Sequence, residues 1–280
     1  MSASTATPAG TATPGARRPR RLTKRQQQRL VRGVLYVVFV AGLVGLVLLA
    51  DWETTRRNFF NVELARTMFP EVLTIAARNT ILYTFLAFSF GLAFGLLLAL
   101  MRLSSITPYR WLATIYIETF RGLPALLTIF LVGIGIPIAF GTRWPTLVTI
   151  TLGLGIVAAA YMAETIRAGI EGVPKGQMEA ARSLGMSYTR AMISIIIPQG
   201  FRIIIPPLTN ELVLLIKDTS LLFVIGTTPA TKELLKFGRD LLNTNANATP
   251  LIVVGAVYLM ITVPLTQLVR VLERRNARSR

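Results

Sequence analysis

Six ionisable side chains interrupt stretches of sequence that are otherwise apolar and long enough to cross a lipid bilayer. They are Glu118, Arg121, Glu164, Glu211, Lys217 and Asp218. An ionised side chain at the centre of a bilayer costs about 2.5 to 3.5 kcal/mol on insertion scales, so these side chains should face protein or a cavity. A zwitterionic solute needs a cation or a helix amino terminus for its carboxylate and an acceptor for its ammonium group. If a polar solute crosses the membrane along this chain, these residues are the candidates for contacting it.

Arg121 is the candidate for the carboxylate of such a solute. It is followed by Gly122 and Pro124, where a helix would break and free backbone groups for binding. Glu118 lies three residues earlier on the same helical face and would alternatively pair with Arg121, which would make both residues structural. The sequence favours neither of these two interpretations over the other.

The other candidates also have a structural interpretation. Glu164 would contact solute or hold Arg167, again at helical spacing, with the structural role slightly favoured. Asn79 and Thr80 offer uncharged hydrogen bonds, although threonine in membrane helices often bonds its own backbone. With these residues the predicted solute path is complete.

A dense polar group stands inside another apolar stretch, and Glu211 lies about two turns before it. It consists of Lys217, Asp218, Thr219 and Ser220. Such density is hard to explain as packing, yet a Lys-Asp pair could equally be a buried hinge or a subunit contact whose charges neutralise each other. The sequence therefore predicts a functional segment without fixing its role.

Catalysis and metal binding by the chain itself are not expected. The sequence contains no cysteine and no histidine, which removes thiolate chemistry and the common zinc and general-base arrangements. It also lacks a glycine-rich phosphate loop of the form G-x-x-x-x-G-K-[ST]. We predict no catalytic residue, no metal site and no cofactor bound by this chain.

The composition predicts an all-α integral membrane protein. Of 280 residues, 52% are hydrophobic and 15% are charged, whereas a globular domain carries about 25% charged residues. Apolar stretches long enough to cross about 30 Å of hydrocarbon recur along the chain. They cover residues 34–50, 72–101, 110–140, 145–168, 203–225 and 249–270. About six transmembrane helices are therefore expected.

The charge distribution predicts the orientation. The net charge of +17 would suit a nucleic-acid binder, but eight of the thirty basic residues lie between Arg17 and Arg32, just before an apolar stretch. Basic residues also follow the last one, as the positive-inside rule requires. We expect a disordered basic cytoplasmic tail at residues 1–33, a first membrane helix at 34–50, a membrane domain at 72–270 and a basic cytoplasmic tail at 271–280. No nucleic-acid partner is predicted.

The segment at about 170–200 differs from the other connections because it is long and amphipathic, and it is interpreted as a cytoplasmic helical hairpin. Within it, Glu179-Ala180-Ala181-Arg182 is followed by Gly185 and then by Ile195, Ile197 and Pro198. The two alanines allow close approach of another surface, Gly185 can adopt the left-handed conformation that ends a helix, and Pro198 can begin the next segment. The alternative is an amphipathic hairpin lying on lipid, with Arg182 and Arg190 meeting phosphates.

This spacing resembles the EAA loop of binding-protein-dependent ABC importers. Four further stretches resemble the branch that handles polar amino acids, over roughly residues 72–275. They are "RNTILYTFLAFSFGLAFGLLLALMRLS", "YIETFRGLPALLTIF", "AAAYMAETIRAGIEGVPKGQMEAARSLG" and "NELVLLIKDTSLLFVIG". The family pattern usually has leucine in place of Ile197, a volume-conserving difference. Many members of the branch have five spans, so the helix at 34–50 would be an addition to a five-helix core.

The resemblance implies a permease subunit of an ATP-driven amino-acid importer in the bacterial plasma (inner) membrane, with a cytoplasmic amino terminus. Its implied partners are a second permease, identical or related, two cytoplasmic ABC ATPase subunits that bind the ATP, and an extracytoplasmic amino-acid-binding protein. The remaining implied partners are the lipid bilayer and a polar amino acid as the substrate. The EAA loop would form coupling helices that dock on the ATPase.

Two alternatives belong to other classes of protein. An ion-gradient-driven secondary transporter would also have broken helices and charges at the midplane, but it would normally need more spans and internal repeats. A membrane scaffold without transport activity is permitted by the composition and opposed only by the motifs. Uptake that is independent of ATP would favour the first alternative, and normal uptake with a bulky residue at position 185 would favour the second.

Overall fold

The computed structural model describes residues 24–142 and 144–278, and divides the chain into two units at Trp52 and Glu53. The first unit contains helix α1 (Lys24–Leu49), which buries none of its residues against protein. Its length and apolar composition suit a membrane span. The predicted disordered tail at 1–33 needs correction, because residues 24–33 are helical, whereas residues 1–23 lie outside the described residues. The glutamine- and arginine-rich sequence there favours helix and contains no proline.

The second unit begins with two short helices and a long one. Helices α2 (Trp52–Phe59) and α3 (Val62–Thr67) precede a π-helical turn, Val72–Ala77, which leads without a break into α4 (Arg78–Leu103). Asn61 caps α3 by accepting a hydrogen bond from the Leu64 amide. The turn and α4 together form the first membrane-length helix of this unit.

The next span is broken at the position that the sequence indicated. Helix α5 (Thr107–Gly122) ends where Leu123 and Pro124 adopt extended dihedrals, and α6 (Ala125–Phe130) starts a new direction 107° away. A π-helical turn, Leu131–Gly135, and α7 (Ile136–Phe140) continue it. Proline cannot donate the intrahelical hydrogen bond and disfavours helical dihedrals in the residue before it, so the bend follows from the sequence.

The following helices form the hairpin and the spans on either side of it. Helix α8 (Thr146–Glu171) is membrane-length, and α9 (Lys175–Ser183) and α10 (Tyr188–Ala191) form the hairpin. A π-helical turn, Met192–Ile196, joins α10 to α11 (Ile197–Asp218), and a 3₁₀ segment, Thr219–Val224, extends α11. The predicted start of this span at residue 203 is therefore too late, because Pro198 lies in the first turn of α11, where proline is tolerated.

The last elements are α12 (Leu234–Asn245), preceded by a 3₁₀ turn, Pro229–Thr231, and the membrane-length helix α13 (Thr249–Arg278). Helix α13 continues through residues 271–278 of the predicted basic tail. In all, the described residues contain five membrane-length helices, or six if the bent pair of α5 and α6–α7 is one span. The prediction of an all-α membrane fold with about six spans is confirmed.

The core of the second unit is the contact between α4 and α8. A Cβ placed on Gly95 would lie 2.9 Å from the Ala159 carbonyl oxygen, and one placed on Gly91 would lie 2.9 Å from the Ala158 Cβ. Small residues on both helices let the backbones approach this closely, which replaces the hydrophobic driving force that lipid does not supply. This pair of helices is the frame on which the other spans pack.

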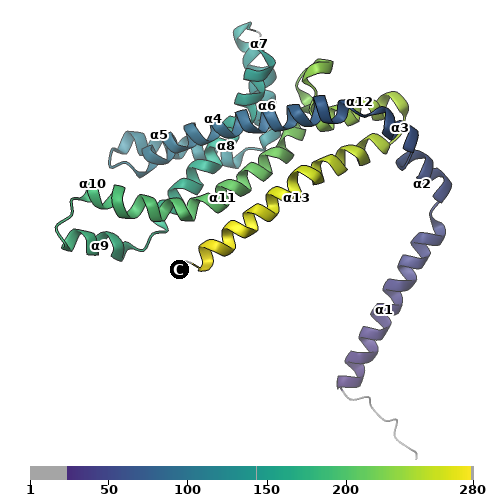
Figure 1. Cartoon of the computed structure of the whole chain (residues 1–280), viewed down its shortest axis with the longest axis horizontal. Helices are drawn as coiled ribbons and strands as arrows, with labels where there is room; N and C mark the ends of the chain where they lie inside the picture. Colours follow the sequence, from purple (N-terminus) through teal and green to yellow (C-terminus); the bar gives the residue numbers. More distant parts are fainter. Residues whose placement is uncertain (1–23, 143, 279–280) are drawn as a thin grey trace, which may run out of the picture. The chain divides into compact units, whose positions relative to one another are not determined.

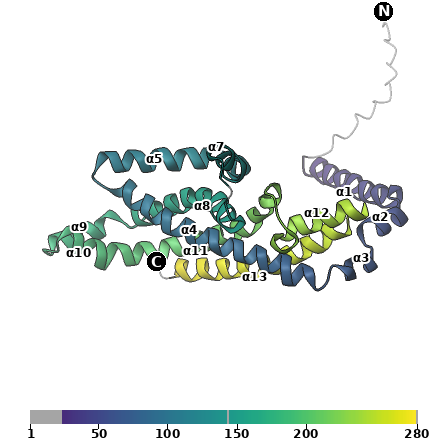
Figure 2. The same cartoon turned by 90° about the horizontal axis from the view of Figure 1, so that it is seen from above.

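Within the second unit the hairpin and α12 lie at opposite ends. Figures 1 and 2 both show α9 and α10 at one end, with α12 and α3 at the other. We call the first the hairpin end and the second the α12 end. Helix α4, with the π-helical turn that precedes it, runs from the α12 end toward the hairpin end.

Candidate functional site: a hairpin, a cavity and a charge cluster

The hairpin presents most of the predicted motif to solvent. Glu179, Ala180 and Arg182 are exposed on α9, whereas Ala181 is buried, with 3% of its surface accessible. The buried alanine lets α9 pack on the arm formed by α10 and its π-helical turn, and the other three residues are available to a partner. Sequence reasoning missed Leu184, whose side chain is 83% exposed at the tip.

Gly185 ends α9 as the sequence predicted. Its φ is +83°, in the left-handed region, and its amide donates to the Arg182 carbonyl at 3.1 Å. The next amide, of Met186, donates to the Ala181 carbonyl at 3.1 Å, which completes the hydrogen-bond pattern of a glycine-terminated helix. A side chain at Gly185 would meet no neighbouring atom within 4 Å, so its requirement for glycine is conformational.

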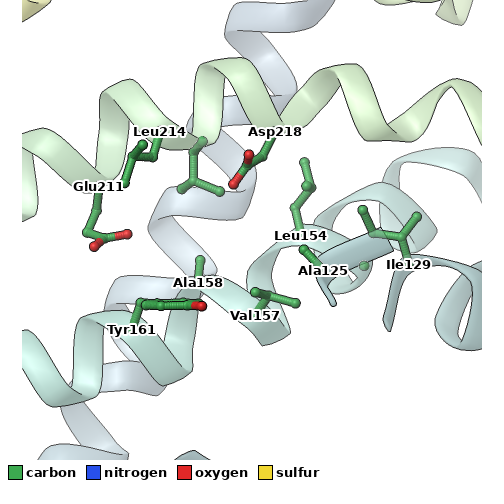
Figure 3. Close-up of a pocket in the computed structure, with 11 residues that line it drawn as sticks. Ala125, Ile129, Leu154, Val157, Ala158, Tyr161, Glu211, Leu214 and Asp218 are labelled. Carbon is green, nitrogen blue, oxygen red and sulfur yellow. The ribbon is translucent and has the colours of Figure 1, made fainter. Parts of the chain in front are cut away.

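A cavity of about 240 Å³ lies between α6, α8 and α11. It is lined by Ala125, Ile129, Gly153, Leu154, Val157, Ala158, Tyr161, Glu211, Leu214, Leu215 and Asp218. Figure 3 shows that the carboxylates of Glu211 and Asp218 point from α11 into the space between α11 and α8, with Tyr161 on the α8 side. The two acids are seven residues apart, two helical turns, which puts them on one face of α11. The cavity therefore carries two carboxyl groups in a largely apolar wall.

The structure separates the residues of the polar group at 217–220. Asp218 lines the cavity, whereas Lys217 is exposed. Thr219 is buried and donates its hydroxyl proton to the Ile216 carbonyl at 2.6 Å, which is the local backbone bond expected of threonine in a helix. The predicted neutralising pair of Lys217 and Asp218 is not among the ion pairs of the described residues. Of this group, only Asp218 contributes to the cavity.

Arg121 stands beside the cavity, where α5 ends. Its guanidinium lies 5.7 Å from the centre of the Tyr161 ring, and Tyr161 is one of the lining residues. This distance suits a cation–π contact. Of the two interpretations left open for Arg121, the pair with Glu118 is not among the ion pairs of the described residues, and Glu118 instead pairs with Arg102 at 3.3 Å. Arg121 is thus a cation at the edge of a cavity whose acids are Glu211 and Asp218.

A charge cluster joins the hairpin ends of α4 and α8 to the C-terminal part of α5. It consists of Arg102, Glu118, Glu164, Arg167 and Glu171. Glu164 accepts from Arg102 at 2.8 Å and from Arg167 at 2.5 Å, which confirms the predicted pair of Glu164 and Arg167. Arg167 also pairs with Glu171. Arg102 was missed by sequence reasoning because it lies just beyond the apolar stretch 72–101, where a basic residue is expected for topology alone.

Asn79 and Thr80 hold the chain that leads into α12. The Asn79 side-chain amide donates to the carbonyls of Ala230 and Lys232 at 2.8 and 3.0 Å. The Thr80 hydroxyl oxygen accepts from the Leu234 amide at 3.2 Å. Both side chains are buried, and neither lines the cavity. Through these hydrogen bonds the two side chains hold the segment before α12 against α4.

Glu233 is the buried acid at the α12 end, and sequence reasoning did not single it out. Its side chain accepts hydrogen bonds from the amides of Leu235 and Lys236, both at 2.6 Å, and so caps α12. The Tyr258 hydroxyl donates to it at 3.1 Å, which ties α12 to α13. Within the described residues, no group of three or more acidic side chains is arranged to hold a metal ion.

Residues 91–278 match a family model whose description is "Binding-protein-dependent transport system inner membrane component". The matched segment covers more than half of the chain and contains the hairpin, the cavity and the charge cluster. The chain belongs to this family. It is therefore a multi-pass inner-membrane component of a binding-protein-dependent transport system.

The relatives of this transport component agree with the assignment. The probable glutamine ABC transporter permease protein GlnM of Bacillus subtilis is 38% identical over 203 residues, which are 72% of this chain and 91% of the relative. The arginine transport system permease protein ArtQ of the same organism is 34% identical over 185 residues, 66% of this chain and 83% of ArtQ. A solved structure reported as "Crystal structure of an amino acid ABC transporter with histidines" superposes with a TM-score of 0.69 at 36% identity, over 75% of this chain and 95% of that one.

Glu233 gives the transport component a pH-dependent stability. Burial raises the pKa of Glu233 from its ordinary value of 4.5 to about 7, although the two amides and the Tyr258 hydroxyl favour the ionised form. Between these values the folded chain holds a proton that the unfolded chain releases, so stability is highest at low pH and is lost as the pH rises through 7. The contribution is at most roughly 3 kcal/mol.

We expect the thermal unfolding midpoint in detergent to fall as the pH is raised from about 5 to about 8, and to fall less steeply in Glu233→Gln, which imitates the protonated acid. Glu63→Gln is the matched control, because Glu63 is an exposed acid in the first turn of α3, at the same end of the unit. Parallel pH profiles for the natural protein and Glu233→Gln would contradict this origin of the dependence.

Proposed function

We propose that the chain is the permease subunit of an ATP-driven importer that carries polar amino acids through the cavity beside Arg121. Cytoplasmic ATPase subunits would dock on the hairpin and bind the ATP, so the chain itself would hold no cofactor. A second permease, identical or related, and an extracytoplasmic binding protein would complete the complex. The amino terminus and the hairpin end would face the cytoplasm, and the α12 end would face outward.

The observation that carries this proposal is the presence of two acidic side chains in a small cavity and of a basic side chain at its edge. Glu211 and Asp218 point into it, and Arg121 lies at its edge over Tyr161. A zwitterion needs both signs of charge, because an unpaired ammonium or carboxylate group would lose its hydration inside the membrane. The volume of about 240 Å³ lies below the range of about 300–1,000 Å³ of drug-sized ligand pockets, and so favours a small solute.

The relatives support the same class of substrate. GlnM is named for glutamine and ArtQ for arginine, and the superposed structure is described as that of an amino acid transporter with histidines. These solutes share an α-ammonium and an α-carboxylate group and differ in the side chain. The hairpin supports ATP-driven transport, because an exposed docking surface on the cytoplasmic side would have no partner in an ion-gradient-driven transporter.

The test of the class is uptake of labelled glutamine, glutamate, arginine and histidine by cells with and without this gene. Depletion of ATP and collapse of the proton gradient serve as separate treatments. We expect loss of at least one uptake activity, and we expect that activity to depend on ATP rather than on the gradient. Uptake that follows the gradient would contradict the proposal and favour a secondary transporter.

Neutralising the cavity acids should weaken uptake of the amino acid that this panel identifies. A hydrogen bond to a charged group contributes about 1.5 to 3 kcal/mol, so Glu211→Gln and Asp218→Asn should each raise the KM of uptake about tenfold or more. Uptake kinetics in proteoliposomes measure the effect, and Glu273→Gln, at an exposed acid near the end of α13, is the control. An unchanged KM in both cavity variants would place the path elsewhere.

A further inference from the structure

Three residues of the charge cluster lie on α8, between the part of that helix that lines the cavity and the hairpin that follows it. Tyr161, which lines the cavity, is followed on α8 by Glu164 at helical spacing and then by Glu171, the last residue of the helix. Only Gly172, Val173 and Pro174 separate Glu171 from α9. Of the two helices that join the hairpin to the cavity, α8 and α11, α8 is therefore the one that carries the cluster between them.

Arg102 extends the cluster to two other helices. It lies in the last turn of α4 and donates to Glu164 of α8 at 2.8 Å and to Glu118 of α5 at 3.3 Å. A guanidinium suits this role, because its planar fork can bind two carboxylates at once. Helix α5 also ends at the residues around Arg121, beside the cavity. Arg102 thus connects the hairpin end of α8 to the helix that carries the cation of the proposed path.

Exposure divides the cluster into a shielded centre and an accessible rim. The side chains of Arg102, Glu164 and Arg167 are 20%, 23% and 22% exposed, whereas Glu118 and Glu171 are 60% and 54% exposed. A shielded ion pair is weak evidence for a stabilising role, because apolar residues of similar volume often stabilise as well or better. Discrete ion pairs do specify one relative position of the helices that they join, which is what transmission of movement requires.

We propose that Arg102 and Glu164 are positioning residues that make α4 and α5 move with the hairpin end of α8. This inference rests on the proposed function, because it assumes that an ATPase displaces the hairpin. With the cluster intact, displacement of α9 shifts α8, α4 and α5 together and so changes the cavity beside Arg121. Without Arg102 the end of α8 moves alone, and ATP is hydrolysed without movement of the amino acid.

The experiment uses the assembled transporter in proteoliposomes, with its ATPase, its binding protein and the labelled amino acid that the uptake panel identifies. The quantity measured is the number of amino-acid molecules transported per ATP hydrolysed. We expect Arg102→Gln to lower this ratio about tenfold, while the rate of ATP hydrolysis stays within about twofold of the natural complex. Arg102→Lys, which keeps the charge near Glu164, should recover at least about half of the ratio.

Arg110→Gln is the matched control, because Arg110 is an exposed arginine of α5 whose described contact is a 3.5 Å hydrogen bond to Thr107. It should leave the ratio unchanged. Glu164→Gln is a second variant of nearly the same shape and should lower the ratio as Arg102→Gln does. If the two residues act through each other, the double variant should be no worse than the worse single variant.

A purely structural role predicts a different result. In that case Arg102→Gln and Glu164→Gln would reduce the amount of assembled complex but leave the transport ratio of the remaining complex at its natural value, and this outcome would overturn the inference. Failure of the proposed function is distinguishable, since it would appear in the natural complex as no ATP-dependent transport of any amino acid. The inference itself is judged only from variants compared with a natural complex that transports.

Discussion

Replacing Gly95 by leucine should prevent the membrane core from forming its closest helix contact. A Cβ at this position would lie 2.9 Å from the Ala159 carbonyl oxygen and 3.1 Å from the Ala163 amide nitrogen. Both atoms belong to the backbone of α8, so no side-chain rotation relieves the overlap. Forced separation of two packed helices costs about 3 kcal/mol or more, which corresponds to a fall in unfolding midpoint on the order of 10 °C.

The measurement is the yield of monodisperse protein in mild detergent together with its thermal unfolding midpoint. Gly255→Leu is the matched control, because Gly255 also lies inside a membrane-length helix and a Cβ there meets no atom within 4 Å. We expect the control to purify normally. Equal stability of Gly95→Leu and Gly255→Leu would show that α4 and α8 do not pack as described.

Replacing Gly185 by valine should separate ATP hydrolysis from uptake while the protein still inserts and folds. The φ of +83° is unfavourable for a residue with a Cβ by roughly 1 to 2 kcal/mol, and more for a β-branched one. The hairpin would avoid this strain by changing the direction of the chain after α9, which would displace Leu184 and Met186 from their positions at the tip. Because 1.4 kcal/mol is a factor of ten, uptake should fall about tenfold or more.

Gly185→Asn is the control for this prediction, because asparagine tolerates the left-handed conformation better than other residues. It should retain most of the uptake. The amount of protein in the membrane should be the same for both variants, since a Cβ at this position meets no neighbouring atom within 4 Å. Normal uptake by correctly inserted Gly185→Val would contradict a coupling role of the hairpin and favour the scaffold alternative.

The two glycines show different limits of sequence reasoning. Gly185 was predicted to be left-handed from local features alone, because a helix-forming segment ends there and another begins soon after. The essential role of Gly95 depends on α8, whose contacting residues lie more than sixty positions later in the chain. The sequence around a glycine in an apolar run does not indicate which distant helix packs against it.

The residues of the predicted path also divide into those that local features placed correctly and those whose contacts depend on distant helices. Glu211 and Asp218 were correctly placed away from lipid, since the cost of exposing a charge to hydrocarbon applies to each residue separately. One alternative for Glu118, a pair with Arg121, was wrong. Helical spacing within the sequence indicates Arg121 as a neighbour, but it cannot indicate Arg102, which lies on another helix. Asn79 and Thr80 proved to hold the segment before α12, which follows them by about 150 residues.

By itself the sequence determined the membrane environment, the number of spans, the helix break before Pro124 and the left-handed end of α9. These features depend on composition, hydrophobic length and the dihedral preferences of neighbouring residues, all of which act over a few turns. Only the tertiary structure decided that Arg102 joins three helices, that Asp218 rather than Lys217 faces the cavity and that Glu233 is buried. Such relationships are created when distant helices pack, because the rotation of each helix and the identity of its neighbour are set by side-chain contacts across the whole unit.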